Sequence, residues 1–342
     1  MNVKVISRKV NNMDFKVIRV QNNNNFQVDL LNYGATIKSV FLNGKIMNLT
    51  PDNWSGFIDC APFYGKTVGR YAGRIENGLF RLNDVQYELD LNNGGNCLHG
   101  GINTISNKLF NYRINQSEDN VEVIFYLHDE ENLFPGDVDF KITYTIASNE
   151  NSILIDYNAT SNEDTILNLT NHTYFNLSGN YKKTVLDEIM YIDADRFTKL
   201  KENMCLESIE MVNEVMDFRT PKKIGQDIEH GFLQNHPTKG YDHCYVLNNR
   251  DFEEIKASLY DEESKIKLSV YTTYPCVVIY TCNYPSDKLV YHHKTVRKYD
   301  GVCFECQYMP NSINYSNETI LRKGQIYHEK TKFVFESEEC SL

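Results

Sequence analysis

The chain has 342 residues, of which 41% are hydrophobic and 24% charged, so it can bury a sizeable core. Acidic residues outnumber basic ones by 46 to 35, which gives a formal net charge of −11. This balance argues against nucleic acid or an anionic membrane surface as a partner, because both attract basic patches.

Nothing near the start of the chain indicates export. Residues 1–20 mix charges with short apolar pairs and lack the continuous apolar core of a signal peptide. No apolar stretch approaches the roughly 18 residues that a membrane-spanning helix needs. We therefore expect a cytoplasmic protein whose nine cysteines are reduced thiols.

Apolar and polar residues alternate along much of the chain, a pattern typical of β-strands with one buried face. One short helix is expected within residues 221–230, which follow Thr220 and begin with a proline, a residue favoured at the first helical position. In chain order, the segments expected to be extended are 26–42, 79–91, 121–127, 138–160 (a hairpin), 243–248, 266–270 and 276–282.

Strands at short spacing without helices between them predict an all-β fold, either an antiparallel sandwich or a barrel. The aromatic content of 12% also favours strands. No composition shift and no Pro/Ser-rich linker marks a boundary along the chain. We therefore expect a single domain over residues 1–342.

Two segments place a histidine where a ligand could meet it. His99 lies in the glycine-rich run 92–101, where glycines permit positive φ and let a ligand approach the backbone. His172 lies in the run 166–177, where a period of two puts leucines and a phenylalanine on one face. The opposite face suits a neutral, hydroxyl-rich ligand, because it carries uncharged hydrogen-bonding groups: Asn168, Thr170, His172, Tyr174 and Asn176.

Glu305 is the acid that the sequence singles out. It stands in the run 301–311, which is otherwise aromatic, thiol and amide in character. A carboxylate with such neighbours in a late strand is poorly solvated, and its pKa rises toward the range of a base that works at neutral pH. If the run is a strand, two sets of side chains point to opposite faces: Cys303, Glu305 and Gln307 on one, Phe304, Cys306 and Tyr308 on the other.

Each of these residues also has a structural interpretation, since many histidines and glutamates in strands are satisfied structural groups. The combination of His99, His172 and Glu305 is what indicates a site. The pair Cys303 and Cys306 has C-x-x-C spacing, but in a strand the two sulfurs lie on opposite faces. No second cysteine pair has metal-ligand spacing, so we expect two buried thiols rather than a metal or redox pair.

Six motifs, in this order, resemble those of the aldose 1-epimerase (galactose mutarotase) family. Any one of them is weak, but together they span nearly the whole chain. They are residues 32–37 (NYGATI), 69–80 (GRYAGRIENGLF), 98–101 (LHGG), 171–177 (NHTYFNL), 240–245 (GYDHCY) and 304–307 (FECQ).

The resemblance implies a large twisted antiparallel β-sandwich with few short helices and a sugar bound in an open groove. It implies that Glu305 is the general base and His172 the general acid. It also implies that the sugar is held by four further residues: Arg74, His99, Tyr174 and Asp242. Taken without the resemblance, Arg74 could be a surface ion-pair partner and Asp242 a turn residue.

The implied reaction interconverts the α and β anomers of a neutral aldohexose such as galactose or glucose. A base takes the proton of the C1 hydroxyl while an acid protonates the ring oxygen, and the opened aldehyde rotates and closes again. Glutamate and histidine suit this because each can give and take a proton near neutral pH. The expected partner is a small sugar, with no cofactor and no metal, and the expected assembly is a monomer or homodimer.

The chain departs from the family pattern at three positions. Gly73 stands where the family usually has Asn, Val278 where it usually has Gln, and Asn311 where it usually has Asp. Gly73 and Val278 each remove an amide that could contact the sugar, so the sequence leaves the preferred sugar open.

Three alternative functions remain. The substrate could be a different or modified sugar, including a phosphosugar, if Arg70 or the stretch 294–298 added charge beside Arg74. The fold could also serve a non-catalytic sugar-binding or regulatory protein, although such a protein does not need a matched acid and base. A glycoside hydrolase would use two carboxylates, such as Asp242 and Glu305, and its chemistry does not call for His172.

Overall fold

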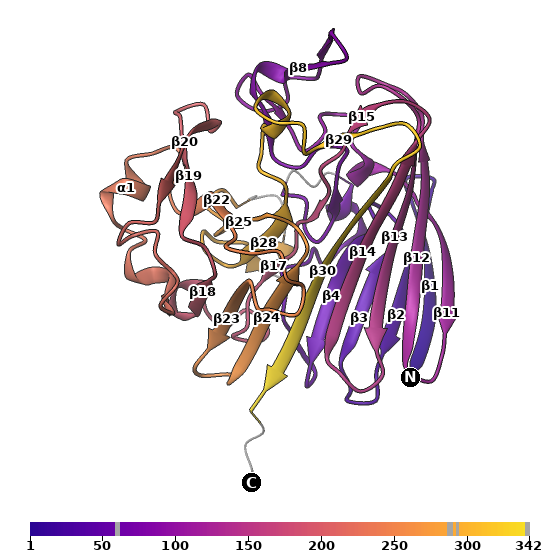
Figure 1. The fold of residues 1–342 in the computed structure, drawn as a ribbon. Coiled ribbons are helices and arrows are strands. Elements are labelled where there is room, and N and C mark those ends of the chain that lie inside the picture. Colours follow the sequence, from indigo (N-terminus) through magenta and orange to yellow (C-terminus); the bar gives the residue numbers. More distant parts are fainter. Residues whose placement is uncertain (59–61, 286–289, 292–293, 339–342) are drawn as a thin grey trace.

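The computed structural model describes residues 1–58, 62–285, 290–291 and 294–338, and β-strands predominate in it (Figure 1). The strands within each sheet pair in antiparallel fashion. The largest sheet has nine strands, in this order: β11 (Asn111–Gln116), β12 (Asn120–Asp129), β13 (Val138–Ala147), β14 (Ser152–Ser161), β30 (Ile326–Ser337), β24 (Ile266–Thr272), β23 (Ala257–Asp261), β18 (Ile189–Ile192) and β21 (Lys222–Lys223).

Two smaller sheets accompany the nine-stranded sheet. The six-stranded sheet is ordered β17 (Tyr174–Phe175), β28 (Val302–Gln307), β25 (Cys276–Tyr280), β22 (Asp242–Val246), β19 (Arg196–Leu200) and β20 (Leu206–Met211). The five-stranded sheet is ordered β1 (Asn2–Val10), β2 (Met13–Gln21), β3 (Gln27–Leu31), β4 (Thr36–Leu42) and β5 (Lys45–Ile46).

Short elements connect the sheets. The two-stranded pairs are β6 (Thr67–Val68) with β16 (Thr170–Asn171), β7 (Arg74–Ile75) with β10 (Cys97–Leu98), β8 (Leu79–Leu82) with β9 (Val85–Glu88), β15 (Thr165–Ile166) with β29 (Ile320–Leu321), and β26 (Val290–Tyr291) with β27 (Lys294–Thr295). Single turns of 3₁₀ helix lie at Trp54–Phe57, Glu76–Gly78, Ile105–Asn107, Val185–Asp187, Ile224–Gln226 and Ser312–Asn314, and the α-helix α1 is Gly231–Gln234.

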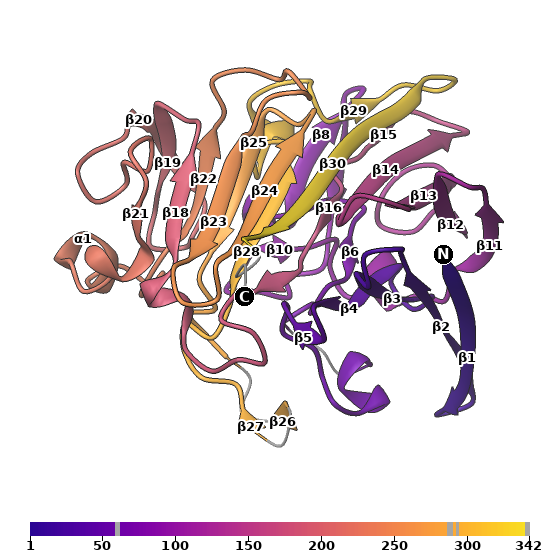
Figure 2. The same ribbon diagram turned by 90° about the horizontal axis from the view of Figure 1, so that it is seen from below.

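One face of the nine-stranded sheet is apolar across its central strands, and this face carries the main core. In the hairpin β13–β14, Ile142 lies opposite Tyr157, and both side chains are fully buried. Residues of the other two sheets, such as Val28 of β3 and Phe304 of β28, enter the same hydrophobic cluster. The three sheets therefore form the antiparallel sandwich that the sequence predicts (Figure 2).

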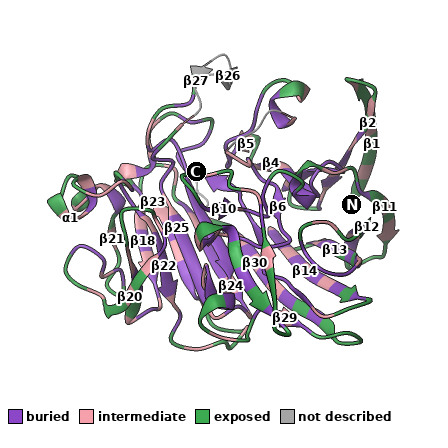
Figure 3. Ribbon diagram, turned by 90° about the horizontal axis from the view of Figure 1, so that it is seen from above, coloured by how far each residue is buried: buried purple, intermediate pink, exposed green. Residues whose placement is uncertain are grey.

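Burial differs from strand to strand in both layers of the sandwich (Figure 3). Strands such as β30 alternate between buried and exposed residues, because their outer face meets solvent. Strand β28, the second strand of the six-stranded sheet, is buried along its whole length. Both faces of this strand are therefore covered, and a charged side chain on it is held away from bulk water.

The expected helix within residues 221–230 is wrong. Lys222 and Lys223 form β21 on the edge of the nine-stranded sheet, and only a 3₁₀ turn follows at Ile224–Gln226. Pairing with β18 takes the backbone groups that a helix would need, and Ile224 is fully buried. Within the described part of the chain, no helix is long and apolar enough to cross a membrane.

Candidate active site

A pocket of about 600 Å³ lies on the face of the six-stranded sheet that is turned away from the main core. The two sides of β28 show this, because Phe304 and Cys306 enter the core whereas Glu305 and Gln307 line the pocket. The pocket brings together every site residue that the sequence singles out: Arg74, His99, His172, Tyr174, Asp242 and Glu305.

Strands β22, β25 and β28 form the floor of the pocket, and their register aligns side chains across it. Val278 of β25 lies opposite both Cys244 of β22 and Glu305 of β28. Asp242 stands two residues before Cys244, on the same face of β22. The Glu305 carboxylate therefore has an apolar neighbour on the adjacent strand.

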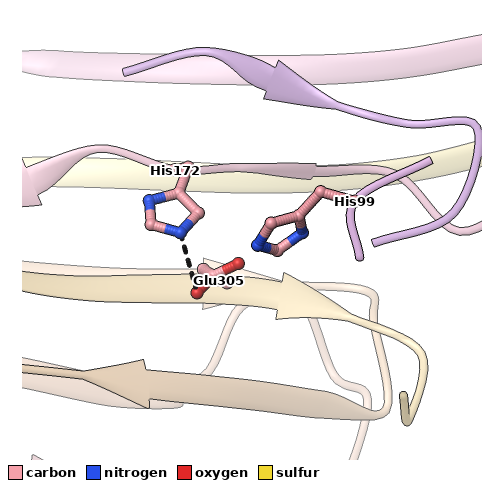
Figure 4. A group of neighbouring side chains, drawn as sticks. All are labelled: His99, His172 and Glu305. Atoms are coloured by element: carbon pink, nitrogen blue, oxygen red, sulfur yellow. Dashed lines mark ion pairs between the residues drawn. The ribbon is translucent and has the colours of Figure 1, made fainter. Parts of the chain in front are cut away.

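His172 lies between β16 and β17, where backbone hydrogen bonds fix the main chain. Its N–H donates to the carbonyl of Lys66, and its carbonyl accepts from the N–H of Gly65, both at 2.9 Å. The ring then points at β28: Nε2 lies 3.4 Å from Oε1 of Glu305, and Nδ1 lies 3.5 Å from Sγ of Cys303. Figure 4 shows the pair with His99 beside it.

His99 approaches the same carboxylate from the loop after β10. Its backbone is left-handed, with φ of 54°, and its N–H donates to the carbonyl of Gly73. In return, the N–H of Gly73 donates to Nδ1 of His99 at 3.2 Å. One ring nitrogen each of His99 and His172 and one carboxylate oxygen of Glu305 lie within 4.8 Å of one another.

The bond from Gly73 determines how His99 can act. Because Nδ1 accepts the hydrogen bond from Gly73, the neutral ring must carry its proton on Nε2. Nε2 of His99 is then a hydrogen-bond donor without a free lone pair. This suits contact with an oxygen atom of a ligand better than coordination of a metal ion.

Tyr174 supports His172 rather than presenting its hydroxyl. The two ring centroids lie 5.0 Å apart. The Tyr174 hydroxyl donates to the carbonyl of Pro62 at 3.0 Å, and the residue is 2% exposed. Tyr174 therefore lines the pocket with its aromatic ring and not with its hydroxyl.

Arg74 and Asp242 supply the charges on the walls of the pocket. Arg74 is half-buried, and its Nε donates to Oδ1 of Asn93 at 3.1 Å. The Asp242 carboxylate makes no hydrogen bond or ion pair with the residues that the structure describes. Burial raises the pKa of Asp242, and the charge of Arg74 acts against that rise. Both side chains retain hydrogen-bonding capacity for a ligand.

Burial moves the pKa values of the central pair apart. It lowers the pKa of His172 from 6.5 to about 4. It raises the pKa of Glu305 well above 4.5, and the nearby Asp242 adds to that rise while Arg74 opposes it. Between these two values the empty pair carries one proton in total.

The unusual glycine of the arginine motif is required by the backbone. Gly73 has φ of 76°, and a Cβ placed on it would lie 2.7 Å from Cβ of Pro310. The next residue, Asn311, is also left-handed and accepts from the N–H of Glu76 through Oδ1 at 3.1 Å. Gly73 and the loop after β28 thus fit one another, which the sequence does not reveal.

Two residues of β28 join the site without having been assigned to it from sequence. Cys303 contacts His172, whereas Cys306 lies in the main core, so the two thiols do lie on opposite faces. Gln307 lines the pocket, and its Oε1 is buried without a hydrogen-bond partner among the described residues. The period-two face shared with Glu305 was the signal that could have identified both.

Known proteins resemble this chain in sequence and structure. A family profile described as aldose 1-epimerase matches residues 16–334. Galactose mutarotase of Sus scrofa is 31% identical over 320 residues, which cover 90% of this chain and 91% of that protein. The aldose 1-epimerase of Haemophilus influenzae is 31% identical over 341 residues, with 94% and 96% covered. Galactose 1-epimerase from Lactobacillus acidophilus NCFM has a similar structure, with a TM-score of 0.86 at 28% identity and coverage of 99% and 100%. The chain therefore belongs to the aldose 1-epimerase family and is an isomerase that acts on sugars.

Proposed function

We propose that the protein interconverts the α and β anomers of a neutral aldohexose, such as galactose or glucose, by acid/base-catalysed ring opening and closure. The observation that carries the proposal is the 3.4 Å approach of His172 Nε2 to Glu305 Oε1 at the floor of the pocket. Two groups that exchange protons at this separation can serve two oxygen atoms attached to the same anomeric carbon.

In the opening step, Glu305 takes the proton of the C1 hydroxyl and His172 gives a proton to the ring oxygen. The C1–O5 bond breaks, the aldehyde rotates about C1–C2, and the ring closes with the proton transfers reversed. This cycle requires one proton on the pair, and the opposed pKa shifts of Glu305 and His172 support that state. The same shifts favour the proton on Glu305, so the bound sugar must favour its transfer to His172.

The remaining residues hold the sugar between acid and base. Nε2–H of His99 and the unused N–H groups of Arg74 would donate to sugar oxygens, and the Asp242 carboxylate would accept from sugar hydroxyls. Tyr174 would keep the ring of His172 in place through the contact between the two tilted rings. Such positioning lowers the entropic cost of reaching the transition state.

The charges of the pocket favour a neutral substrate over a phosphosugar. Among the lining residues that the structure describes, Arg74 is the one arginine or lysine, and two acids, Asp242 and Glu305, face the same space. Arg70 is buried elsewhere and bound to Asp129. Of the stretch 294–298, Lys298 lies over the ring of Tyr299, and the side chain of Lys294 is outside the described residues.

The proposed chemistry moves protons alone. No electron, phosphoryl group or carbon fragment is transferred, so the reaction needs neither a redox cofactor nor a group carrier. The donor character of His99 Nε2 also argues against a metal held by His99, His172 and Glu305, since a ligating nitrogen must offer a lone pair.

Polarimetry of freshly dissolved α-D-galactose and α-D-glucose tests the proposal. The protein should speed the relaxation of at least one sugar without changing the final rotation. Glu305→Gln should reduce the rate by about 10²- to 10⁴-fold while sugar binding, measured by calorimetry, persists. Glu188→Gln is the matched control, because Glu188 is also buried but does not line the pocket. Unchanged turnover in Glu305→Gln would contradict the base assignment.

A further inference from the structure

An apolar patch interrupts the polar floor of the pocket directly beside the base. Val278 and Cys244 line the pocket, and together with Cys276 they form a buried cluster against Met309. The thiols of Cys244 and Cys276 interact with each other, and this contact, together with burial, raises the pKa of Cys244. The patch therefore offers little to a sugar hydroxyl.

The register determines which part of a bound sugar meets this patch. Val278 lies directly opposite Glu305, and side chains so paired have Cβ atoms about 4.5–5.5 Å apart. When Glu305 contacts the C1 hydroxyl, the sugar groups expected to meet Val278 are the substituents next to the reacting atoms. These are the group on C2, adjacent to C1, and the C6 group on C5, adjacent to the ring oxygen.

A hydroxyl at that position would be buried without a partner. Such burial costs about 1–3 kcal/mol, whereas a methylene or methyl group there gains from leaving water. Apolar pockets reject an added hydroxyl by a factor of up to about 10². The patch thus discriminates between sugars that differ in a single oxygen atom.

On the other side of Glu305, the pocket offers a polar group in place of the apolar patch. Gln307 stands two residues after Glu305 on the same face of β28 and is fully buried. Its Nε2 donates to the carbonyl of Tyr308, while its Oε1 has no partner in the described part of the chain. An unpaired buried acceptor is costly, and a sugar hydroxyl would satisfy it. The sugar is therefore expected to retain its hydroxyls away from Val278.

We propose that the preferred substrate is a deoxyhexose that lacks the hydroxyl over Val278, at C2 or at C6. This proposal rests on the proposed function, because it places the anomeric carbon between Glu305 and His172. It assigns to Val278 the selection of the deoxygenated position, and to Gln307 an anchor for one of the remaining hydroxyls.

The test compares glucose and galactose with their 2-deoxy and 6-deoxy derivatives by polarimetry, each corrected for its own spontaneous mutarotation. For the wild type, kcat/KM for one deoxy derivative should exceed that of its parent by about 10- to 100-fold. Val278→Gln supplies an amide at the patch and should shift this ratio toward the parent sugar. Val278→Ile keeps the patch apolar and should preserve the ratio.

Each outcome decides between the two proposals. If each parent sugar reaches the same kcat/KM as both of its deoxy derivatives, the deoxyhexose proposal is overturned while the proposed function stands. If a deoxy sugar is preferred but Val278→Gln leaves the ratio unchanged, the role given to Val278 is wrong. If no sugar is accelerated, the proposed function itself fails. Gln307→Leu tests the anchor role. If this variant raises KM for all sugars and leaves the ratio of deoxy to parent sugar unchanged, Gln307 is an anchor; an unchanged KM contradicts that role.

Discussion

Arg70 and Arg74 stand four residues apart in one motif, yet their guanidinium groups differ in burial and in the number of hydrogen bonds they make within the chain. The side chain of Arg70 is 1% exposed, and its guanidinium makes five hydrogen bonds. They reach one carboxylate oxygen of Asp129 and four backbone carbonyls of the segment 129–136. Arg74 makes one, to Asn93, and the rest of its guanidinium lines the pocket.

The buried carboxylates also differ in whether their hydrogen bonds are made within the chain. Asp129 is buried between Arg70 and Lys108 and pairs with both. Within the described part of the chain, Asp242 makes no such pair, and His172 is the one residue within ion-pair distance of Glu305. A buried charged group whose hydrogen bonds are all made within the chain contributes to the stability of the fold and has no bonds left for a ligand. One whose bonds are left open is available to a ligand, at some cost to stability.

Replacing the acid should give the largest effect on activity. His172→Asn removes the proton donor to the ring oxygen, and we expect kcat to fall by about 10²- to 10⁴-fold. The free energy of unfolding should change little, because the ring has few bonds to lose. His230→Asn is the control, since His230 is exposed and Asn can keep its role as the N-cap of α1. A His172→Asn enzyme that keeps its full rate would contradict the acid assignment.

Replacing the saturated arginine should give the reverse result. Arg70→Met leaves Asp129 buried with a single cationic partner, and we expect a loss of about 3–5 kcal/mol in the free energy of unfolding, measured with urea. The kcat of the protein that remains folded should match the wild type. Adding Asp129→Leu should restore part of the stability, because it removes the uncompensated charge. If Arg70→Met instead abolished turnover in a fully folded protein, the division between the two arginines would fail.

The sequence could predict the strands, but it could not predict which arginine has all its hydrogen bonds made within the chain and which one faces the pocket. The alternation of the segment 138–160 predicts β13 and β14 because inward and outward side chains differ in polarity. The face shared by Cys303, Glu305 and Gln307 follows from the same rule. The hydrogen-bond partners of Arg70 lie far away in the sequence, at the end of β12 and in the loop that follows it. Nothing near Arg70 or Arg74 in the sequence therefore distinguishes the two arginines.

The acid/base pair should also reveal itself in the pH dependence of stability. The folded pair holds one proton, and so does the unfolded pair between pH 4.5 and 6.5, where Glu305 is ionised and His172 is protonated. The two groups therefore cancel in the wild type over this window. In Glu305→Gln, only the lowered pKa of His172 remains, so the free energy of unfolding relative to the wild type should fall by about 2 kcal/mol as the pH drops from 6.5 to 4.5.

His172→Asn should show the opposite slope over the same window. The raised pKa of Glu305 then acts alone, so stability relative to the wild type should fall as the pH rises from 4.5 to 6.5. Urea denaturation at the two pH values measures both slopes. Slopes of the same sign in Glu305→Gln and His172→Asn would contradict the assignment of one shared proton.

The smallest expected effect belongs to the arginine that faces the pocket. Arg74→Met should raise KM by about tenfold, the value of one or two hydrogen bonds to an uncharged sugar, while unfolding changes by less than about 1 kcal/mol. Arg81→Met is the control, because Arg81 is exposed and donates to the carbonyl of Asp84 away from the pocket. If Arg74→Met unfolds as readily as Arg70→Met, its bonds are structural after all. If its KM is unchanged, Arg74 does not hold the sugar, and an open guanidinium in the pocket would require another ligand to explain it.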